Sequence, residues 1–245
     1  MSGHVDFFPN GGKIQPNCPA TDGKLLNAIF TFATSFQINN YGDGTVCNHM
    51  AAVAYFTDSI ENEECKYVGY PCNSLTDFNN GNCLTCSSKG CNRMGYQATL
   101  GNDNGLIYLA TQNGIKSPFC QHQISINLIS NTLTGQNQAR GTFKISLTGE
   151  KGTSPFIELD NADVTFKPGS IENRLIASAK YVGENISQVS VSYTKTTNII
   201  SSFLYQDQWS FRQIDLFYAD NQKNLRFCPS TSYIQSGSSV VFNKC

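Results

Sequence analysis

Apolar and polar residues alternate along the second half of the chain. The alternation is regular in "QISINL" (123–128) and in "TFKISL" (142–147). Because successive side chains of a β-strand point to opposite faces, each run gives a strand one apolar face to bury. Five further candidate strands are "RLIASAKYVG", "ISQVSVSYT", "WSFRQIDLFYA", "NLRFCP" and "SSVVFNKC". Short runs separated by Gly, Asn and Pro, with no helical pattern between them, predict an all-β sandwich over residues 105–245.

In the run that contains the single tryptophan, the apolar residues shift from odd-numbered to even-numbered positions partway along. Trp209 and Phe211 share one parity. The apolar residues that follow have the other parity, and they are Ile214, Leu216 and Tyr218. One extra residue in a strand produces such a change, so we predict a bulge or bend near Gln213. We expect Trp209 to lie in the core of the sandwich.

Before residue 97 the apolar spacing becomes helical. In "KLLNAIFTFATSF" (24–36) apolar residues recur every three or four positions and form a wide stripe. The stripe includes Leu25, Leu26, Ile29, Phe30, Phe32 and Phe36. One interpretation is an ordinary core helix. The other is a lid, because a bridge between the flanking Cys18 and Cys47 would close a loop that moves as a unit and turns its apolar face toward lipid.

A second helical pattern begins at Val46. Its apolar residues on one face are Val53, Phe56 and Ile60. Asn48 is a suitable N-cap, which would place His49 at the first helical position. The positive end of the helix dipole disfavours imidazolium, so this ring would stay neutral and suit a general base. A structural histidine in a first helical turn is the alternative.

A general base in ester cleavage needs a nucleophile within hydrogen-bond reach and a carboxylate that orients its ring. No G-x-S-x-G nucleophile elbow occurs in the chain, and every cysteine near His49 has a candidate disulfide role. His4 and His122 lie in strand-like segments, where we expect structural roles. The residues alone therefore offer one candidate base and no nucleophile for it.

The charge balance argues against a nucleic-acid partner. The 245 residues include 17 basic and 18 acidic residues, and 14% of the chain is charged. A nucleic-acid-binding surface would need a basic stripe, which is missing. The chain is long enough for two domains or one large one.

Cysteine usage favours an oxidising, extracellular setting. The ten cysteines are Cys18, Cys47, Cys65, Cys72, Cys83, Cys86, Cys91, Cys120, Cys228 and Cys245. Zinc ligation by Cys83, Cys86 and Cys91 is an alternative, although a second CxxC motif and a nearby histidine are missing. The sequon at Asn185 is a glycosylation candidate and fits secretion.

The first residues, "MSGHVDFFPNGGK", have neither the basic region nor the apolar core of a signal peptide. No run of about 18 apolar residues occurs elsewhere, so we expect no transmembrane anchor. A disulfide-type chain without a signal peptide suggests that its true beginning is missing and that Met1 is internal or an artefact of the gene model.

Several motifs resemble the pancreatic lipase family. They are "GHVDFFPNGGKIQPNC" (3–18), "CNHMAAVAYFTDSI" (47–60), "GYPC", "NCLTC", "GCNRMGY" and the terminal cysteine pair, in family order. The resemblance covers essentially the whole chain and is strongest through residue 97. It implies that residues 1–97 are the C-terminal part of an α/β-hydrolase catalytic domain with a lid at 18–47. A linker at 98–104 would then lead to a PLAT-type β-sandwich at 105–245.

The resemblance also implies roles for single residues. His49 would be the general base that takes the serine proton and hands it to the leaving alcohol. The implied disulfides are Cys18–Cys47, Cys72–Cys83, Cys86–Cys91 and Cys228–Cys245. Cys65 and Cys120 are left over, and they could bridge the two domains or remain free thiols.

The departures from the family pattern matter equally. In the family the serine elbow, the triad aspartate, the oxyanion-hole donors and the calcium site lie upstream of the first motif, in a portion that is absent here. We therefore expect this polypeptide to be inactive by itself, with no cofactor or metal of its own. Gly42 also stands about where pancreatic-type members carry an arginine that supports the triad.

Three functions remain open from the sequence. The first is part of a secreted lipase acting on triacylglycerol-type lipids at an interface, with a colipase-like protein as a candidate partner. The second is a non-enzymatic lipid-surface or protein-binding module derived from a lipase. The third is a catalytically dead paralogue. Nothing in the sequence selects among triglyceride, phospholipid and galactolipid substrates.

Overall fold

A computed structural model describes residues 5–16, 18, 44–62, 65–86, 90–100, 105–112, 117–132, 138–160, 163–196 and 205–245. The chain divides into two compact units. Unit 1 consists of residues 1–78 and 85–121, and unit 2 consists of residues 79–84 and 122–245. The predicted lid helix at 24–36, Gly42 and His4 lie outside the described residues.

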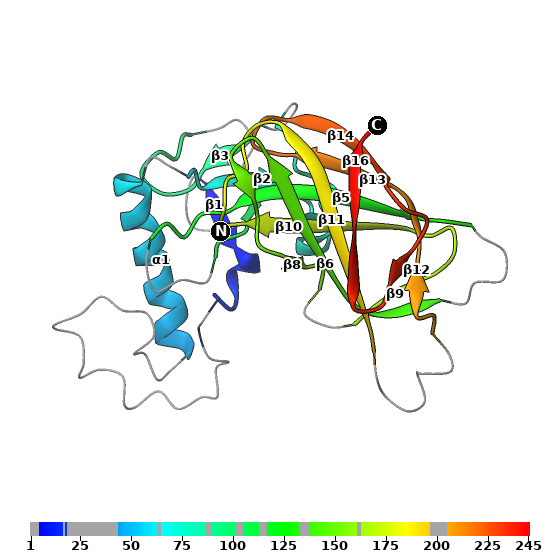
Figure 1. Ribbon diagram of the computed structural model, residues 1–245. Helices are drawn as coiled ribbons and strands as arrows, with labels where there is room; N and C mark the ends of the chain where they lie inside the picture. The colour runs from blue at the N-terminus through cyan, green and yellow to red at the C-terminus, as the bar shows by residue number, and fades with distance from the viewer. Residues whose placement is uncertain are drawn as a thin grey trace. The chain divides into compact units, whose positions relative to one another are not determined.

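Unit 2 is built from β-strands (Figure 1). The strands are β5 (His122–Ser130), β6 (Ala139–Gly149), β7 (Gly152–Thr153), β8 (Ile157–Glu158), β9 (Val164–Phe166), β10 (Ile171–Ser178), β11 (Ile186–Lys195), β12 (Gln208–Trp209), β13 (Phe211–Tyr218), β14 (Lys223–Pro229), β15 (Ile234–Gln235) and β16 (Ser238–Lys244). The main sheet has the order β10-β5-β13-β14-β16-β11-β6-β7. All its pairings are antiparallel. The prediction of an all-β second part is confirmed, and this arrangement is compatible with a β-sandwich.

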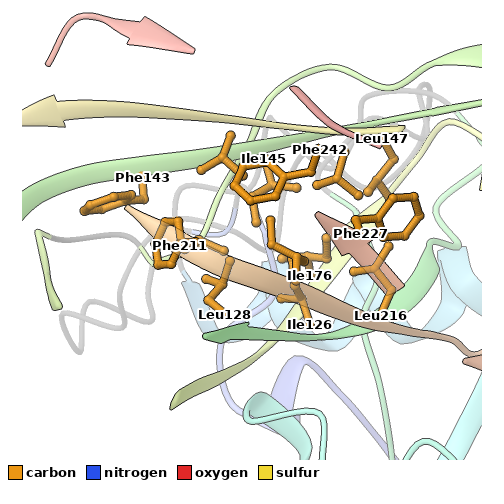
Figure 2. Close-up of a cluster of buried hydrophobic side chains, with 14 of the residues drawn as sticks. Ile126, Leu128, Phe143, Ile145, Leu147, Ile176, Phe211, Leu216, Phe227 and Phe242 are labelled. Carbon is orange, nitrogen blue, oxygen red and sulfur yellow. The ribbon is translucent and has the colours of Figure 1, made fainter. Parts of the chain in front are cut away.

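The alternating runs supply the core of unit 2. Ile126 and Leu128 of β5 and Phe143, Ile145 and Leu147 of β6 are all buried. Figure 2 shows these side chains gathered with residues from β10, β13, β14 and β16. The polar residues between them alternate to the other face of each strand, as a period of two requires. This shared core explains why apolar and polar residues alternate so regularly in the second half of the sequence.

The parity change after Trp209 marks a β-bulge. Phe211 of β13 pairs with Ser130 of β5, and Gln213 pairs with Ile129, so Arg212 is an extra residue between two successive partners. Arg212 is exposed, whereas Phe211 is buried. The prediction of a bulge near Gln213 is confirmed. Trp209 is fully buried in the core of unit 2, as expected.

The described residues of unit 1 form a small mixed sheet and a long helix. Its elements are β1 (Asp6–Pro9), η1 (Asn10–Gly12), α1 (Gly44–Glu61), β2 (Val68–Pro71), α2 (Leu75–Asn79, whose last residue falls in unit 2), β3 (Asn92–Arg93) and β4 (Leu106–Leu109). The sheet has the order β1-β4-β2-β3. β1 and β4 are parallel, whereas β2 pairs with β4 and with β3 in the antiparallel sense.

The boundary between the units lies later than the sequence analysis placed it. We assigned residues 105–245 to the sandwich, but β4 pairs with β1, and unit 2 resumes only at His122. The segment "LIYL" is a continuous apolar run rather than an alternating one, and its last three residues are buried. Such runs suit strands covered on both faces. β4 therefore belongs to the sheet of unit 1.

Candidate functional site

Helix α1 carries the candidate catalytic residue. It begins at Gly44, so His49 is its sixth residue rather than its first. Asn48 does not act as an N-cap, because its Oδ1 accepts a hydrogen bond from the backbone N of Gln15 at 2.6 Å. The prediction that Asn48 is the N-cap and His49 the first helical residue is therefore wrong.

The segment before the helix fixes its first turns. Cys47 forms a disulfide with Cys18, with 5.5 Å between their Cα atoms. The buried Gln15 donates from Nε2 to the carbonyl of Pro9 at 2.9 Å. Its Oε1 accepts from Asn10 Nδ2 at 3.0 Å and from the Tyr55 hydroxyl at 3.2 Å. These contacts join the β1–η1 segment to α1 and hold the helix that presents His49.

A buried carboxylate fixes the other end of α1. Asp58 accepts hydrogen bonds from the hydroxyls of Tyr67 and Ser117, and from the backbone N of Phe119 at 3.1 Å. Burial raises the pKa of the Tyr67 hydroxyl well above its usual range, and the hydrogen bond to Asp58 adds to this shift. A buried charge is tolerated only when such donors replace water. The role of Asp58 was not predicted from the sequence, although a carboxylate among the apolar residues of a helix face is a signal for a partnered buried charge.

The two faces of α1 differ in burial. The buried face includes Cys47, Ala51, Ala54, Tyr55 and Asp58. The predicted apolar face is the exposed one, since Val53, Phe56 and Ile60 are 41%, 50% and 53% exposed. His49 is exposed and lies four residues before Val53 on this outer face. Within the described residues, no hydrogen bond holds the His49 ring. The outer face of α1 therefore combines a free imidazole with an apolar stripe.

All ten cysteines are disulfide-bonded. Besides Cys18–Cys47, the pairs include Cys86–Cys91 and Cys228–Cys245, the same partners that the resemblance implies. Cys72 and Cys83 are also disulfide-bonded. The zinc alternative is contradicted, because the cluster at 83–91 holds no thiolate, and the described residues contain no group of three potential metal ligands.

Cys65 and Cys120 bond to each other. They join the two segments that the sequence analysis assigned to separate domains. Because the boundary lies at His122, both cysteines belong to unit 1. The free-thiol alternative is wrong, and the bridge is internal to unit 1.

The other candidates lie elsewhere in the chain. The six lid residues are outside the described residues. His122 in β5 is buried and pairs through Nδ1 with Asp220, which fits a structural role. Asn185 is exposed and donates from Nδ2 to Glu150 Oε2 at 3.0 Å. None of the described helices has the length and apolarity needed to cross a membrane.

Comparison with known proteins assigns the family. The Lipase family model matches residues 1–119, which include α1 and His49. Pancreatic triacylglycerol lipase of Equus caballus is 33% identical over 203 residues, which are 81% of this chain and 41% of that protein. Lipoprotein lipase of Bos taurus is 30% identical over 256 residues, covering 99% of this chain and 50% of that protein.

The chain belongs to the pancreatic lipase family. Pancreatic lipase-related protein 2 of Myocastor coypus is 34% identical over 166 residues, or 64% of this chain and 32% of that protein. This lipase-family chain thus spans 32% to 50% of the length of these relatives. A coral 8R-lipoxygenase structure, described as having a C2-like domain, covers 50% of the chain at 15% identity with a TM-score of 0.40. That likeness is too weak to bear on the fold.

Proposed function

We propose that this chain is part of a secreted lipase that hydrolyses carboxylic esters of triacylglycerol-type lipids at an interface. The observation that carries the proposal is the position of His49 on the open face of α1, inside the segment that the Lipase family model matches. An unengaged, exposed imidazole on a helix fixed at both ends is available to a nucleophile from another part of the protein. The ten oxidised cysteines support an extracellular location.

In this proposal His49 acts as the general base. It takes the proton of a serine hydroxyl as the serine attacks the ester carbonyl, and it later donates that proton to the leaving alcohol. The serine and the orienting aspartate come from a part of the protein outside this chain, because the chain has no G-x-S-x-G elbow. The 245-residue polypeptide therefore has no esterase activity of its own.

The apolar stripe beside His49 supports the same proposal. Val53, Phe56 and Ile60 leave an apolar helix face open to water, and soluble proteins commonly cover such faces. The rest of an α/β-hydrolase domain would supply that cover and bring the nucleophile to His49. The segment at 18–47 would act as the lid, and unit 2 would dock on lipid as a PLAT-type sandwich. A colipase-like protein is a candidate partner.

A non-enzymatic module is the alternative function. It is favoured by the lack of a serine elbow in a chain whose unit 2 has a complete core of its own. In that case the chain would bind lipid surfaces or proteins without hydrolysing anything. A catalytically dead paralogue would also bind without turnover.

The test compares three proteins secreted from eukaryotic cells, each directed by the same heterologous signal peptide. The first is the 245-residue chain, and the second adds whatever coding sequence precedes Met1 in frame. The third is the extended protein with His49→Ala. Hydrolysis of emulsified tributyrin is expected only from the second, and His49→Ala should lower its rate by about 10⁴-fold or more. Thr57→Ala is the control, because Thr57 is also exposed on α1 and has no catalytic role.

Two outcomes would refute the catalytic proposal. One is an extended protein that hydrolyses tributyrin equally well with His49→Ala. The other is an extended protein that binds lipid and has no activity at all, which would favour the non-enzymatic module.

A further inference from the structure

Unit 1 contains a cavity that the proposed chemistry does not use. Its volume is about 290 Å³, and its walls come from the end of α1, the segment before β2 and the turn after β3. This volume lies near the lower end of the range for ligand pockets. His49 is not among the residues that line it.

The described lining of the cavity is basic. Lys66 and Arg93 belong to it, and none of its described residues is an aspartate or a glutamate. Within the described residues, neither side chain takes part in an ion pair. Two like charges at one small cavity repel each other, and an anion between them removes that repulsion. Glu61, exposed at the end of α1, does not line the cavity.

Neutral groups complete the lining. Asn62 and Gln97 contribute carboxamides to the wall. Arg93 donates from Nη1 to Gln97 Oε1, so the remaining polar atom of that carboxamide is its NH₂ donor. Arginine presents several donors in a fixed fork, a geometry that matches the oxygens of phosphate. The lining therefore offers positive charge and donors to one oxyanion.

The wall is held in place by backbone contacts. The N–H of Tyr96 donates to Ser59 Oγ at 2.9 Å, and the N–H of Met94 donates to the Tyr67 carbonyl at 2.9 Å. Gly95 has a φ of +93°, and a Cβ there would lie 2.0 Å from Ser59 Oγ. Only glycine allows this turn to approach α1 so closely. The cavity is thus present before any ligand binds.

An exposed aromatic residue stands in the same turn. Tyr96 is 69% exposed, next in sequence to Gly95 and three residues after Arg93. Tyrosine is enriched where an apolar phase meets water, because its ring enters the apolar side and its hydroxyl stays hydrated. A basic cavity beside such a residue suits a phosphate that is attached to a lipid.

We propose that this cavity binds a phosphate group, with the head group of an anionic phospholipid as its source. Lys66 and Arg93 supply the charge, and Tyr96 enters the head-group layer beside them. This site goes beyond the proposed ester hydrolysis, because it binds without turnover and does not involve His49. Glu63 and Glu64 flank the segment in sequence and lie outside the described residues.

The experiment measures binding by the 245-residue chain in two assays. Co-sedimentation uses phosphatidylcholine vesicles with and without phosphatidylglycerol, and a thermal-shift titration uses inorganic phosphate alone. Lys66→Glu/Arg93→Glu should abolish the preference for phosphatidylglycerol, since each basic residue at an anionic surface contributes about fivefold in partitioning. Lys66→Gln/Arg93→Gln should lower partitioning by about 25-fold. Circular dichroism of both variants should match the unmodified chain, because both side chains are exposed.

The matched control is Lys167→Glu/Arg212→Glu in unit 2, which changes the net charge equally at two exposed basic residues. It should retain most of the vesicle binding and all of the phosphate-induced stabilisation. If the unit 1 variants lose the stabilisation by inorganic phosphate but still bind vesicles like the unmodified chain, the cavity is a site for free phosphate and the phospholipid source is wrong. If they bind like the control, or if the unmodified chain binds neither probe, the proposal is wrong.

Discussion

The two units of this lipase-family chain achieve stability in different ways. Unit 2 encloses a core of large aliphatic and aromatic side chains contributed by most of its strands. Among the described residues, the buried cluster of unit 1 is smaller and consists of two alanines, the Cys65–Cys120 pair and a few larger residues. Unit 1 also leaves the apolar face of α1 exposed. The described part of unit 2 therefore has a large core of its own, whereas unit 1 has a smaller buried cluster crossed by a disulfide and an exposed helix face that carries His49.

Core truncation should show the largest difference between the units. Phe143→Ala in unit 2 removes a fully buried ring that stacks on Tyr193 at 4.5 Å between ring centroids. We expect a loss of about 3–5 kcal/mol in the free energy of unfolding. Phe56→Ala on the exposed face of α1 is the matched change and should cost less than about 0.5 kcal/mol. Urea titration with separate probes for the two units measures both, and similar losses would show that α1 is covered in solution.

Removing disulfides should affect unit 1 more than unit 2. The Cys65–Cys120 bridge spans 55 residues, so Cys65→Ala/Cys120→Ala should cost about 4 kcal/mol by the chain-entropy estimate. That loss should unfold unit 1 alone. The Cys228–Cys245 bridge spans 17 residues, and its removal should cost about 3 kcal/mol in a unit with a large core. Proteolysis followed by mass spectrometry should reveal cleavage in unit 1 of the first variant and an intact unit 2 in the second. Cleavage in unit 2 of the first variant would contradict the division.

Alkaline pH should destabilise both units through buried tyrosines. Burial raises the pKa of Tyr67 in unit 1 and of Tyr193 in unit 2 above the ordinary value of 10.0. A raised pKa in the folded state means that the neutral form stabilises the fold below pH 10, and this contribution is lost as pH rises further. The slope should be about 1.4 kcal/mol per pH unit for each group. Tyr193→Phe should reduce the slope for unit 2 and leave that for unit 1 unchanged. Denaturant titrations from pH 8 to pH 11 measure both slopes, and an equal reduction in the two units would contradict the prediction.

The strands of the second unit could be predicted from the sequence because a single physical rule, the alternation of side chains between the two faces of a strand, determines their pattern. The strands of unit 2 follow from period-two alternation, and the bulge at Arg212 follows from the parity change after Phe211. Tertiary contacts override such local rules in unit 1. Asn48 binds the backbone of Gln15 instead of capping the helix, and β4 joins β1 across about 100 residues of sequence. Local patterns carry no information about such distant partners.

The candidate site was also predictable only in part. His49 was identified from its motif, and the family match includes it. Its exposure could not be predicted, because the apolar spacing of Val53, Phe56 and Ile60 is typical of a buried face. The role of Asp58 depends on donors at Tyr67, Ser117 and Phe119, which come together only in the folded unit.

The central claim is that His49 serves an activated serine in the same protein. An organophosphonate that reacts with activated serines should be applied to the extended protein, and the labelled product should be identified by mass spectrometry. We predict that the label lies on a serine outside residues 1–245 and that His49→Ala abolishes it while Thr57→Ala does not. Labelling that persists in His49→Ala, or no labelling of a folded extended protein, would contradict the account.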